Sequence, residues 1–363
     1  MKIAYLIHWN EGPESGVYKK VANQMSEWKK LGHDVTLFLF THNDRHEWSS
    51  ASSGIPVVVQ TYRGFRKRFS EFRKLVKAVE AWMPDVIYHR FDLYYYSLPY
   101  LLKKFPSVLE INTNDLTEMR LEMNFRYYYH LWTRGKVLAA AAGFVFVSGE
   151  LAEERHFKRY VKDRIVIGNG IHLDSVKPVR PADNEYPRFV FIGSSGQSWH
   201  GVDVIAELAA VRPLWQFDLI GVNRAELPEP VPANMAFHGT MTKEHYQGLM
   251  DRADIALGTL ALYRKQMDEA SPLKVREYLA NGLPVIIGYR ETDFPDAAAA
   301  PFILELPNKP GSISAAMGKI EDFVRIWTGK RVNREAIRHL DTGVKEVIRV
   351  DYMRHISEKG ERT

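Results

Sequence analysis

Residues 268–286 read DEASPLKVREYLANGLPVI, and this stretch decides the fold. Ser271 is a residue type that caps helices at their N-terminus, and Pro272 suits the first helical position. Asn281 and Gly282 are typical of a helix end. The apolar run 284–288 that follows is typical of a strand buried in a parallel sheet. A helix with defined ends that leads into such a strand predicts an α/β fold.

The start of this helix also predicts an anion site. The free N–H groups of a helix N-terminus favour a negatively charged ligand such as a phosphate. Lys274 adds a cation in the first turn, where the helix dipole alone would disfavour one. Glu269 lies just before the cap and Glu277 about two turns further on, so both carboxylates flank the site. Such carboxylates suit the hydroxyl groups of a phosphate-bearing ligand.

Apolar runs of strand length alternate with helical periodicities along the rest of the chain. Helices are predicted near 17–31, 76–82 and 202–210, each before or after a strand. The alternation starts again after residue 187, so we expect an α/β protein with two facing, doubly wound, Rossmann-like domains. The predicted strands lie at 3–7, 35–40, 57–60, 86–89, 108–111, 144–147, 165–167, 189–192, 217–221, 253–257 and 284–288.

Three prolines mark the expected boundary between the domains. Pro178, Pro181 and Pro187 surround the polar stretch 182–185, a composition typical of linkers. We expect an N-terminal acceptor-side domain over 1–176 and a C-terminal donor-binding domain over 177–344. A C-terminal helix at about 345–363 is expected to pack back on the first domain.

Composition excludes several classes of protein. The 363 residues include 45% apolar residues and no Cys, which excludes a disordered chain and a disulfide-stapled one. The longest uncharged apolar run, 137–147, is far shorter than the roughly 20 residues that span a bilayer. The N-terminus has no signal-peptide pattern. We expect a cytoplasmic protein, attached peripherally to the inner face of the cell membrane.

Residues 268–286 resemble the donor-site signature of the retaining glycosyltransferases of family 4, which have the GT-B fold. Further segments of the chain resemble that family in the same order. They are Ser15-Gly16 after the first strand, Gly32-His33-Asp34-Val35, Gly168-Asn169-Gly170-Ile171 and Arg252-Ala253-Asp254-Ile255.

The resemblance implies the roles of the donor-site residues. Glu277 would hold the ribose hydroxyls of a nucleotide sugar of the UDP or GDP type, and Glu269 the hydroxyls of the transferred sugar. The Ser271-Pro272-Leu273 turn would hold the diphosphate. The resemblance further implies retention of configuration and no metal or other cofactor, and the sequence contains no Asp-x-Asp. The expected acceptor is a glycan or a lipid-linked molecule in polysaccharide or glycoconjugate synthesis.

One departure from the family concerns the glycine loop after the first strand of the second domain. Relatives carry an Arg and a Lys on the diphosphate where this chain has Ser194 and His200. Lys274, or Arg264 and Lys265, must then supply the positive charge that stabilises the leaving group. Gly16 and the loop residues Gly193, Ser194, Ser195 and Gly196 are expected to contact the donor.

Polar residues follow the strands of the first domain, at the edge where open parallel sheets bind ligands. His8, His89 and Glu110 lie at or beside strand ends, and Asp115 follows shortly after Glu110. We predict that Glu110 or Asp115 orients the acceptor or the reacting sugar. The sequence leaves open which of the two carboxylates does so, and His89 is a further catalytic candidate.

The segment Arg63 to Lys77 concentrates positive charge, with seven basic residues against one acidic residue. Phe65, Phe69, Phe72, Val76 and Val79 recur at helical spacing, which predicts an amphipathic helix. Such a helix could dock on an anionic membrane face, or its apolar side could pack on the sheet.

Two other functions remain open at this stage. One is a sugar-nucleotide epimerase, which can share two Rossmann-like domains but needs no acceptor. The other is a non-enzymatic protein that binds an anion or a nucleic acid through Arg63 to Lys77, although no nucleic-acid motif is present.

Overall fold

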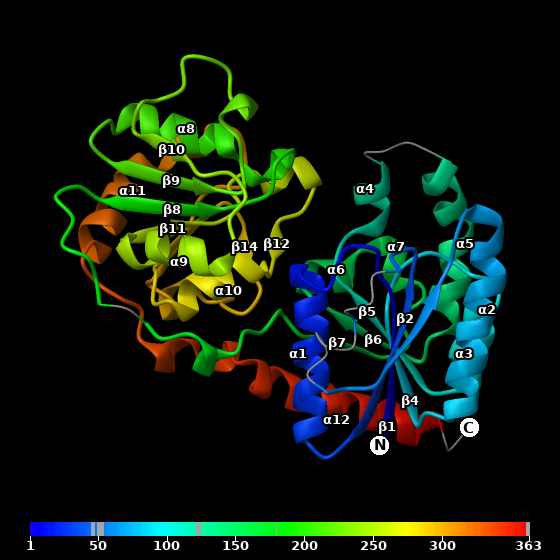
Figure 1. Cartoon of the computed structure of the whole chain (residues 1–363). Coiled ribbons are helices and arrows are strands. Elements are labelled where there is room, and N and C mark those ends of the chain that lie inside the picture. The colour runs from blue at the N-terminus through cyan, green and yellow to red at the C-terminus, as the bar shows by residue number, and fades with distance from the viewer. Residues whose placement is uncertain (45–47, 49–53, 121–124, 179, 361–363) are drawn as a thin grey trace. The chain divides into compact units, whose positions relative to one another are not determined.

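The computed structural model describes residues 1–44, 48, 54–120, 125–178 and 180–360, apart from the side chains of Phe65, Arg66 and Ala297. The chain divides into two compact units. The first unit comprises Met1–Gly168 and Thr342–Thr363, and the second comprises Asn169–Asp341. These divisions lie a few residues before the predicted boundaries at 176 and 344. Both units contain a parallel sheet between helices, so the predicted Rossmann-like fold class is confirmed (Figure 1).

The first unit is built on a parallel sheet of seven described strands in the order β3-β2-β1-β4-β5-β6-β7. Each strand that the sequence predicts in this half is present. The central strands β1, β2, β4, β5 and β6 are mostly buried, whereas the edge strands β3 and β7 are partly exposed. The strands are β1 (Lys2–His8), β2 (Asp34–Thr41), β3 (Val57–Thr61), β4 (Val86–Arg90), β5 (Ser107–Ile111), β6 (Gly143–Phe146) and β7 (Arg164–Val166).

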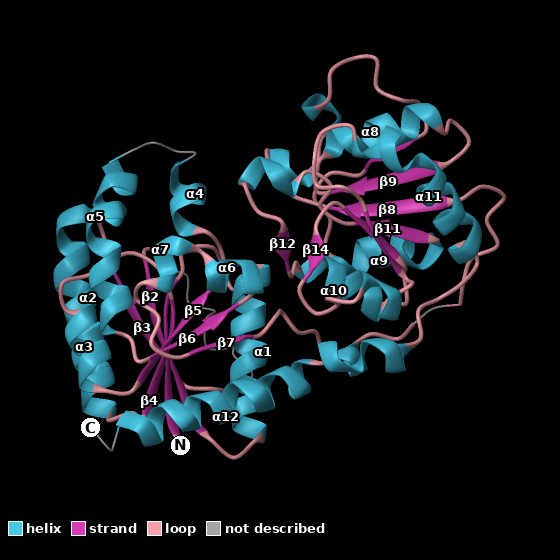
Figure 2. Cartoon of the chain, turned by 180° about the vertical axis from the view of Figure 1, so that it is seen from behind, coloured by secondary structure: helices cyan, strands magenta, loops and turns pink. Residues whose placement is uncertain are grey.

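Helices cover both faces of this sheet (Figure 2). α1 (Gly16–Lys30) and α12 (Thr342–Gly360) pack against each other on one face, while α2 (Phe65–Trp82), α3 (Leu98–Lys104) and α5 (Phe125–Ala140) lie on the other. Tyr5, Trp28 and Tyr88 form an aromatic cluster under α12. The short helices at the edge are α4 (Asp115–Arg120), α6 (Gly149–Glu153) and α7 (Arg155–Lys158).

The apolar side of α2 is part of this core. Phe72, Val76 and Val79 are buried, and the ring of Phe72 stacks on that of Tyr95 with 3.9 Å between centroids. The interpretation in which this apolar side enters a membrane is therefore wrong for these residues. The predicted face also includes Phe65, whose side chain lies outside the described residues.

The second unit is built on a six-stranded parallel sheet in the order β10-β9-β8-β11-β13-β15. α8 (Val202–Val211) and α11 (Ser312–Trp327) pack into one hydrophobic core with the sheet, and α9 (Lys243–Arg252) and α10 (Leu273–Ala280) lie on the opposite face. The strands are β8 (Arg188–Ile192), β9 (Gln216–Ile220), β10 (Met235–Phe237), β11 (Ile255–Leu257), β13 (Val285–Ile287) and β15 (Ile303–Glu305).

Two elements next to α10 were not predicted from the sequence. β12 (Glu269–Ala270) pairs in parallel with β14 (Arg290–Glu291), which fixes Glu269 opposite Arg290. β10 and β15 were also missed, because they contain three residues each and show no alternation that could be recognised. Among the described residues, no helix combines the length and apolar character needed to cross a membrane.

Candidate active site

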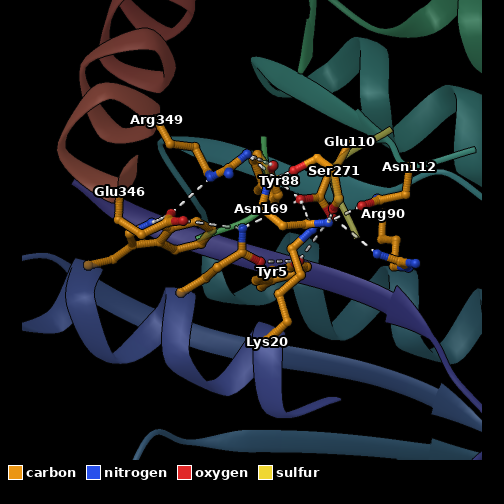
Figure 3. Close-up of polar contacts among 12 residues, drawn as sticks. Tyr5, Lys20, Tyr88, Arg90, Glu110, Asn112, Asn169, Ser271, Glu346 and Arg349 are labelled. Carbon is orange, nitrogen blue, oxygen red and sulfur yellow. Dashed lines mark hydrogen bonds and ion pairs between the residues drawn. The ribbon is translucent and has the colours of Figure 1, made fainter. Parts of the chain in front are cut away.

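The turn before α10 is held by side chains rather than by a helix cap. The N-cap position is Pro272, and Ser271 precedes it, so the predicted N-cap at Ser271 is wrong. The hydroxyl of Ser271 instead accepts hydrogen bonds from the backbone N–H of Asn169 at 2.8 Å and from Arg276 at 2.5 Å. Asn169 also donates its amide to the carbonyl of Ser271, a contact visible in Figure 3. The Ser271-Pro272-Leu273 turn is thus tied to the Asn-Gly-Ile segment.

Arg276 fixes this turn from inside α10. Its guanidinium is fully buried and donates to the carboxylates of Glu291 at 2.6 Å and Asp293 at 2.5 Å. The same guanidinium donates to the carbonyl of Asn169 at 2.7 Å. Sequence reasoning missed Arg276, because its carboxylate partners lie 15 and 17 positions further on, outside the helix, and no local pattern relates them to it. We assign it as a positioning residue for the anion site.

Lys274 is the cation that this turn presents. Its ammonium nitrogen is buried, lies 4.4 Å from the ring centroid of Phe191, and donates no hydrogen bond to any residue that the structure describes. Burial lowers the pKa of Lys274 to about 7, since a charged ammonium is costly away from water. An anion beside this nitrogen would restore its charge, as expected for a phosphate-binding lysine.

The glycine loop after β8 lies beside Lys274. Gly193 leaves no room for a side chain, because a Cβ there would lie 2.5 Å from the ring of Phe191. The N–H of Ser194 points at Nδ1 of His200 at 3.4 Å, so Nδ1 is the acceptor of this imidazole. Burial first, and then the charge of Lys274, lower the pKa of His200 to about 3. His200 is therefore neutral at physiological pH and does not replace the missing lysine.

The outer part of the loop is held by a carboxylate. Ser195 donates its hydroxyl to Glu226 at 2.7 Å, and the backbone N–H of Gly196 donates to the same carboxylate at 3.0 Å. Ser195 and Gly196 therefore bind an anion that the protein itself supplies. Their predicted contact with a donor phosphate stays a prediction, and it requires that the phosphate replace Glu226.

Arg264 has a partner as well. It lies in the single turn Leu262–Lys265, and its guanidinium donates to both oxygens of Asp203 at 2.9 and 2.6 Å. Since Asp203 already neutralises Arg264, this cation is not the one that compensates for Ser194 and His200. Lys274 remains the best-placed cation among those that the sequence proposed.

The two glutamates of the signature have different surroundings. Glu277 lies on α10 one turn after Lys274, accepts a hydrogen bond from the hydroxyl of Tyr246 at 3.0 Å, and has Lys243 at 3.5 Å. Glu269 lies on β12 and is half-buried. The structure thus places one carboxylate on each side of the turn that carries Lys274.

In the first unit, Glu110 lies in a buried polar network (Figure 3). Lys20 donates to its carboxylate at 3.0 Å, with Arg90 at 3.5 Å and Arg349 of α12 at 3.7 Å. Although burial alone would raise it, these three cations hold the pKa of Glu110 well below its usual range. Burial lowers the pKa of Lys20 to about 8. Glu110 is an internal counter-ion, and its predicted catalytic role stays a prediction.

Asp115 is enclosed in the same way at the start of α4. His130 lies 2.5 Å from its carboxylate, and Arg134 donates two hydrogen bonds to it at 2.6 and 2.9 Å. Its pKa is held well below the usual range, because His130, His156 and Arg134 outweigh the effect of burial. The structure does not bring Asp115 into contact with Glu110, and its predicted role also stays a prediction.

His89 lies in β4 and is buried. Its Nδ1 donates to the carbonyl of Leu6 at 3.0 Å, and its Nε2 has no hydrogen-bond partner among the described residues. Burial lowers the pKa of His89 to about 4, so the imidazole is neutral. Gly16 opens α1 after the N-cap Ser15, whose hydroxyl accepts the N–H of Tyr18 at 3.3 Å.

A second group of polar side chains lies at the carboxyl ends of the strands of the first unit. The sequence predicted only part of this group. His8 ends β1 and forms a short contact with Asp92, while its Nε2 lies 2.9 Å from the hydroxyl of Tyr62. Arg68 of α2 reaches the same imidazole at 3.3 Å and donates to Tyr95 at 2.6 Å. His8 was noted at a strand end. Their pairing was missed, because nothing in the sequence relates positions 8 and 92.

A search of the described residues finds no group of His, Cys, Asp and Glu that could hold a metal ion. The anion site at α10 instead offers an ammonium nitrogen.

Known proteins resemble this chain in family and in fold. Residues 15–175 match the family described as Glycosyltransferase Family 4. A search of curated proteins found no match.

The whole chain is similar to solved structures. A sucrose-phosphate synthase from Thermosynechococcus elongatus superposes with a TM-score of 0.63 at 16% identity, covering 99% of this chain and 97% of the other. The Anabaena protein HepE, solved with UDP and glucose, gives 0.62 at 15%, covering 98% and 100%. A UDP-GlcNAc 2-epimerase from Neisseria meningitidis gives 0.53 at 14%, covering 97% and 99%. The predicted GT-B fold and the resemblance to family 4 are confirmed.

Proposed function

We propose that this chain is a glycosyltransferase of the GT-B type that moves a sugar from a nucleotide-sugar donor to a hydroxyl of a glycan or lipid-linked acceptor, with retention of configuration. The observation that carries the proposal is the buried ammonium of Lys274, without a described hydrogen-bond partner, between the carboxylates of Glu269 and Glu277. An epimerase could use the same donor site, so the two activities must be separated by their products.

Each residue of the α10 site has a role in this proposal. Glu277 holds the ribose hydroxyls, Glu269 holds the transferred sugar, and Lys274 neutralises the diphosphate as it leaves. Charge stabilisation of this kind is strong in a site that excludes water, because the dielectric is low there. Arg276 keeps the turn in place through Ser271.

The donor class is UDP or GDP, and UDP is the first candidate because it is bound in the similar HepE structure. A thermal-shift series with UDP, GDP and ADP tests this point. A nucleotide at 100 times its Kd should stabilise the native protein by about 2.7 kcal/mol. Lys274→Met should remove the shift, whereas Lys319→Met, which removes an exposed charge on α11, should leave it unchanged. The absence of a shift with all three nucleotides would contradict the donor assignment.

Product analysis tests the reaction itself. Incubation with donor alone should yield no epimerised nucleotide sugar, and addition of an acceptor should yield a glycoside. Proton NMR of the new anomeric centre should show the configuration of the donor. Formation of an epimer without acceptor would favour the epimerase alternative, and an inverted product would contradict retention.

We further propose a role in cell-surface polysaccharide or glycoconjugate synthesis, in the cytoplasm, with peripheral contact to an anionic membrane face. The proposed contact uses the exposed cations of Arg63 to Lys77 alone, since Phe72, Val76 and Val79 of α2 are in the core. Those cations are Arg63, Lys67, Arg73, Lys74 and Lys77.

Vesicle sedimentation tests the membrane contact. Each cation near an anionic surface contributes about 1 kcal/mol, so reversing Lys67, Lys74 and Lys77 to Glu should abolish binding to anionic vesicles. Reversal of Arg325 and Lys319 on α11 is the control and should have no effect. Unchanged sedimentation of the triple variant would contradict the membrane proposal and leave the glycosyltransferase proposal intact.

A further inference from the structure

Two cavities in the first unit share a wall at Arg126. The first has a volume of about 290 Å³ and lies at the carboxyl ends of β1 and β4. Its wall is polar and carries both charges. The side chains that matter here are His8, Trp9, Asn10, Arg90, Asp92 and Arg126.

The second cavity has a volume of about 260 Å³, and its wall is mainly aromatic. It lies between α2, α5 and the loop after β4. Phe125 at its rim is 73% exposed, so the aromatic wall faces solvent rather than a closed core. Its apolar lining consists of Phe69, Leu93, Tyr94, Tyr95, Phe125 and Tyr129. An exposed apolar hollow on a folded protein is typical of a binding site.

Positive charge lies where the cavities meet. Arg126 lines both of them, and its guanidinium forms no hydrogen bond or ion pair with another described residue. Arg68 lines the aromatic cavity, donates to Tyr95, and lies over the rings of Tyr62 and Tyr95 at 5.3 and 5.1 Å. Asp92 opposes these charges but is already in contact with His8. A guanidinium at this junction is suited to a phosphate group.

We propose that the two cavities form one acceptor site for an amphiphilic molecule with a hydroxyl head, a phosphate and an apolar tail. The head lies by His8 and Arg90, the phosphate contacts Arg126 and Arg68, and the tail occupies the aromatic cavity. This inference rests on the proposed function, because it assigns the acceptor of that reaction. It narrows the acceptor class from any glycan to a lipid-linked one.

The different linings of the two cavities support this assignment. A sugar alone would fill the polar cavity and leave the aromatic one without a ligand. A free phosphate would bind at Arg126 without any use for six apolar side chains. Only a ligand that carries all three kinds of group uses the polar wall, the guanidinium and the aromatic wall together.

The test uses the full-length protein and butyl, hexyl and octyl phosphate as probes, below their critical micelle concentrations. Burial of one methylene contributes about 0.8 kcal/mol, so affinity should rise about fourfold with each added methylene until the cavity is full. Phe125→Asp places a charge at the exposed rim of the aromatic cavity. In this variant the affinity should rise much less with chain length. Arg126→Glu should weaken the alkyl phosphates at least tenfold and leave the neutral octyl glucoside nearly unchanged. Arg155→Glu, an exposed arginine on α7, is the matched control.

The outcomes separate the possible explanations. The proposal would be overturned if the affinity for alkyl phosphates did not depend on the length of the alkyl chain. It would also be overturned if Phe125→Asp showed the same dependence on chain length as the wild-type protein. A preference for anionic vesicles over monomeric alkyl phosphates would show that these residues bind a membrane surface rather than one acceptor molecule, and would also overturn it. The UDP-induced thermal shift reports on the second unit. If UDP gives no thermal shift while the affinity for alkyl phosphates still rises with chain length, the proposed donor site is refuted and the acceptor site is not.

Discussion

Binding of UDP at pH 8 should be accompanied by proton uptake at Lys274. Burial lowers the pKa of this residue to about 7, so only about one molecule in ten carries the charge at pH 8 before binding. A diphosphate beside the ammonium nitrogen should return the pKa toward its usual value of about 10.4. The difference corresponds to an uptake of about 0.9 proton per bound UDP at pH 8, and of about 0.1 at pH 6.

Isothermal titration calorimetry in buffers of different ionisation enthalpy measures this uptake directly. The slope of the apparent binding enthalpy against the buffer enthalpy gives the number of protons. Lys274→Met keeps the length of the side chain and removes the titrating group, so the slope at pH 8 should fall by about 0.9 proton in this variant. Equal slopes for both proteins, with UDP bound in both, would refute the assignment of Lys274 to the diphosphate.

The same pKa predicts how the ligand-free protein responds to pH. Between about pH 7 and pH 10 the unfolded chain holds a proton on Lys274 that the folded chain has lost. The unfolded state binds more protons there, so stability should rise with pH, by at most about 1.4 kcal/mol per pH unit. The unfolding free energies of wild type and Lys274→Met, measured in urea, should diverge in their pH dependence within this window, and their difference should be constant below about pH 7. A constant difference between pH 6 and pH 10 would show that the lysine is not buried in solution.

Other substitutions test the remaining parts of the α10 site. Glu277→Ala should weaken donor binding in calorimetry, while Glu269→Ala should chiefly lower kcat; unchanged donor affinity and turnover in both would contradict their roles. Activity should persist in excess EDTA, because the proposed role of Lys274 is to supply the positive charge that a metal would otherwise supply; loss that a divalent ion restores would refute this. Arg276→Met should lower stability by about 3–5 kcal/mol in urea unfolding, because Glu291 stays buried without its partner; a change below about 1 kcal/mol would show that the ion pair contributes little.

Much of the fold could be predicted from the sequence, because parallel strands buried on both faces appear as continuous apolar runs. The central strands of the first sheet and most of the second sheet follow this rule, whereas the edge strands β3 and β7 are partly exposed. Short strands do not, and β12 and β10 contain too few residues to show a pattern. Helical periodicity also has a limit, since α2 shows the same spacing whether its apolar side meets a membrane or a sheet. The burial of Phe72 decides between them.

The candidate site also has a part that the sequence predicts and a part that only the structure shows. Lys274, Glu269 and Glu277 could be predicted, because helix signals within one short stretch set their spacing. What surrounds them depends on residues far away in the chain. Ser271 accepts its hydrogen bond from Asn169, 102 positions earlier, and the pairing of His8 with Asp92 spans 84 positions. Local patterns carry no information on such contacts, so the cap, the loop amides and the His-Asp pair had to come from the structure.

The return of α12 to the first unit has a consequence for synthesis on the ribosome. Trp28 donates to Glu346 at 2.8 Å and Arg349 donates to Tyr88 at 2.7 Å, while Val350, Met353 and Ile356 close the core under the sheet. The α12 residues of these contacts are translated only after the whole second unit has been made. Until then the nascent first unit exposes an apolar sheet face, and Glu110 lacks the cation of Arg349. A ribosome that stalls before residue 342 would therefore leave an unfinished first unit, a natural substrate for chaperones and proteases.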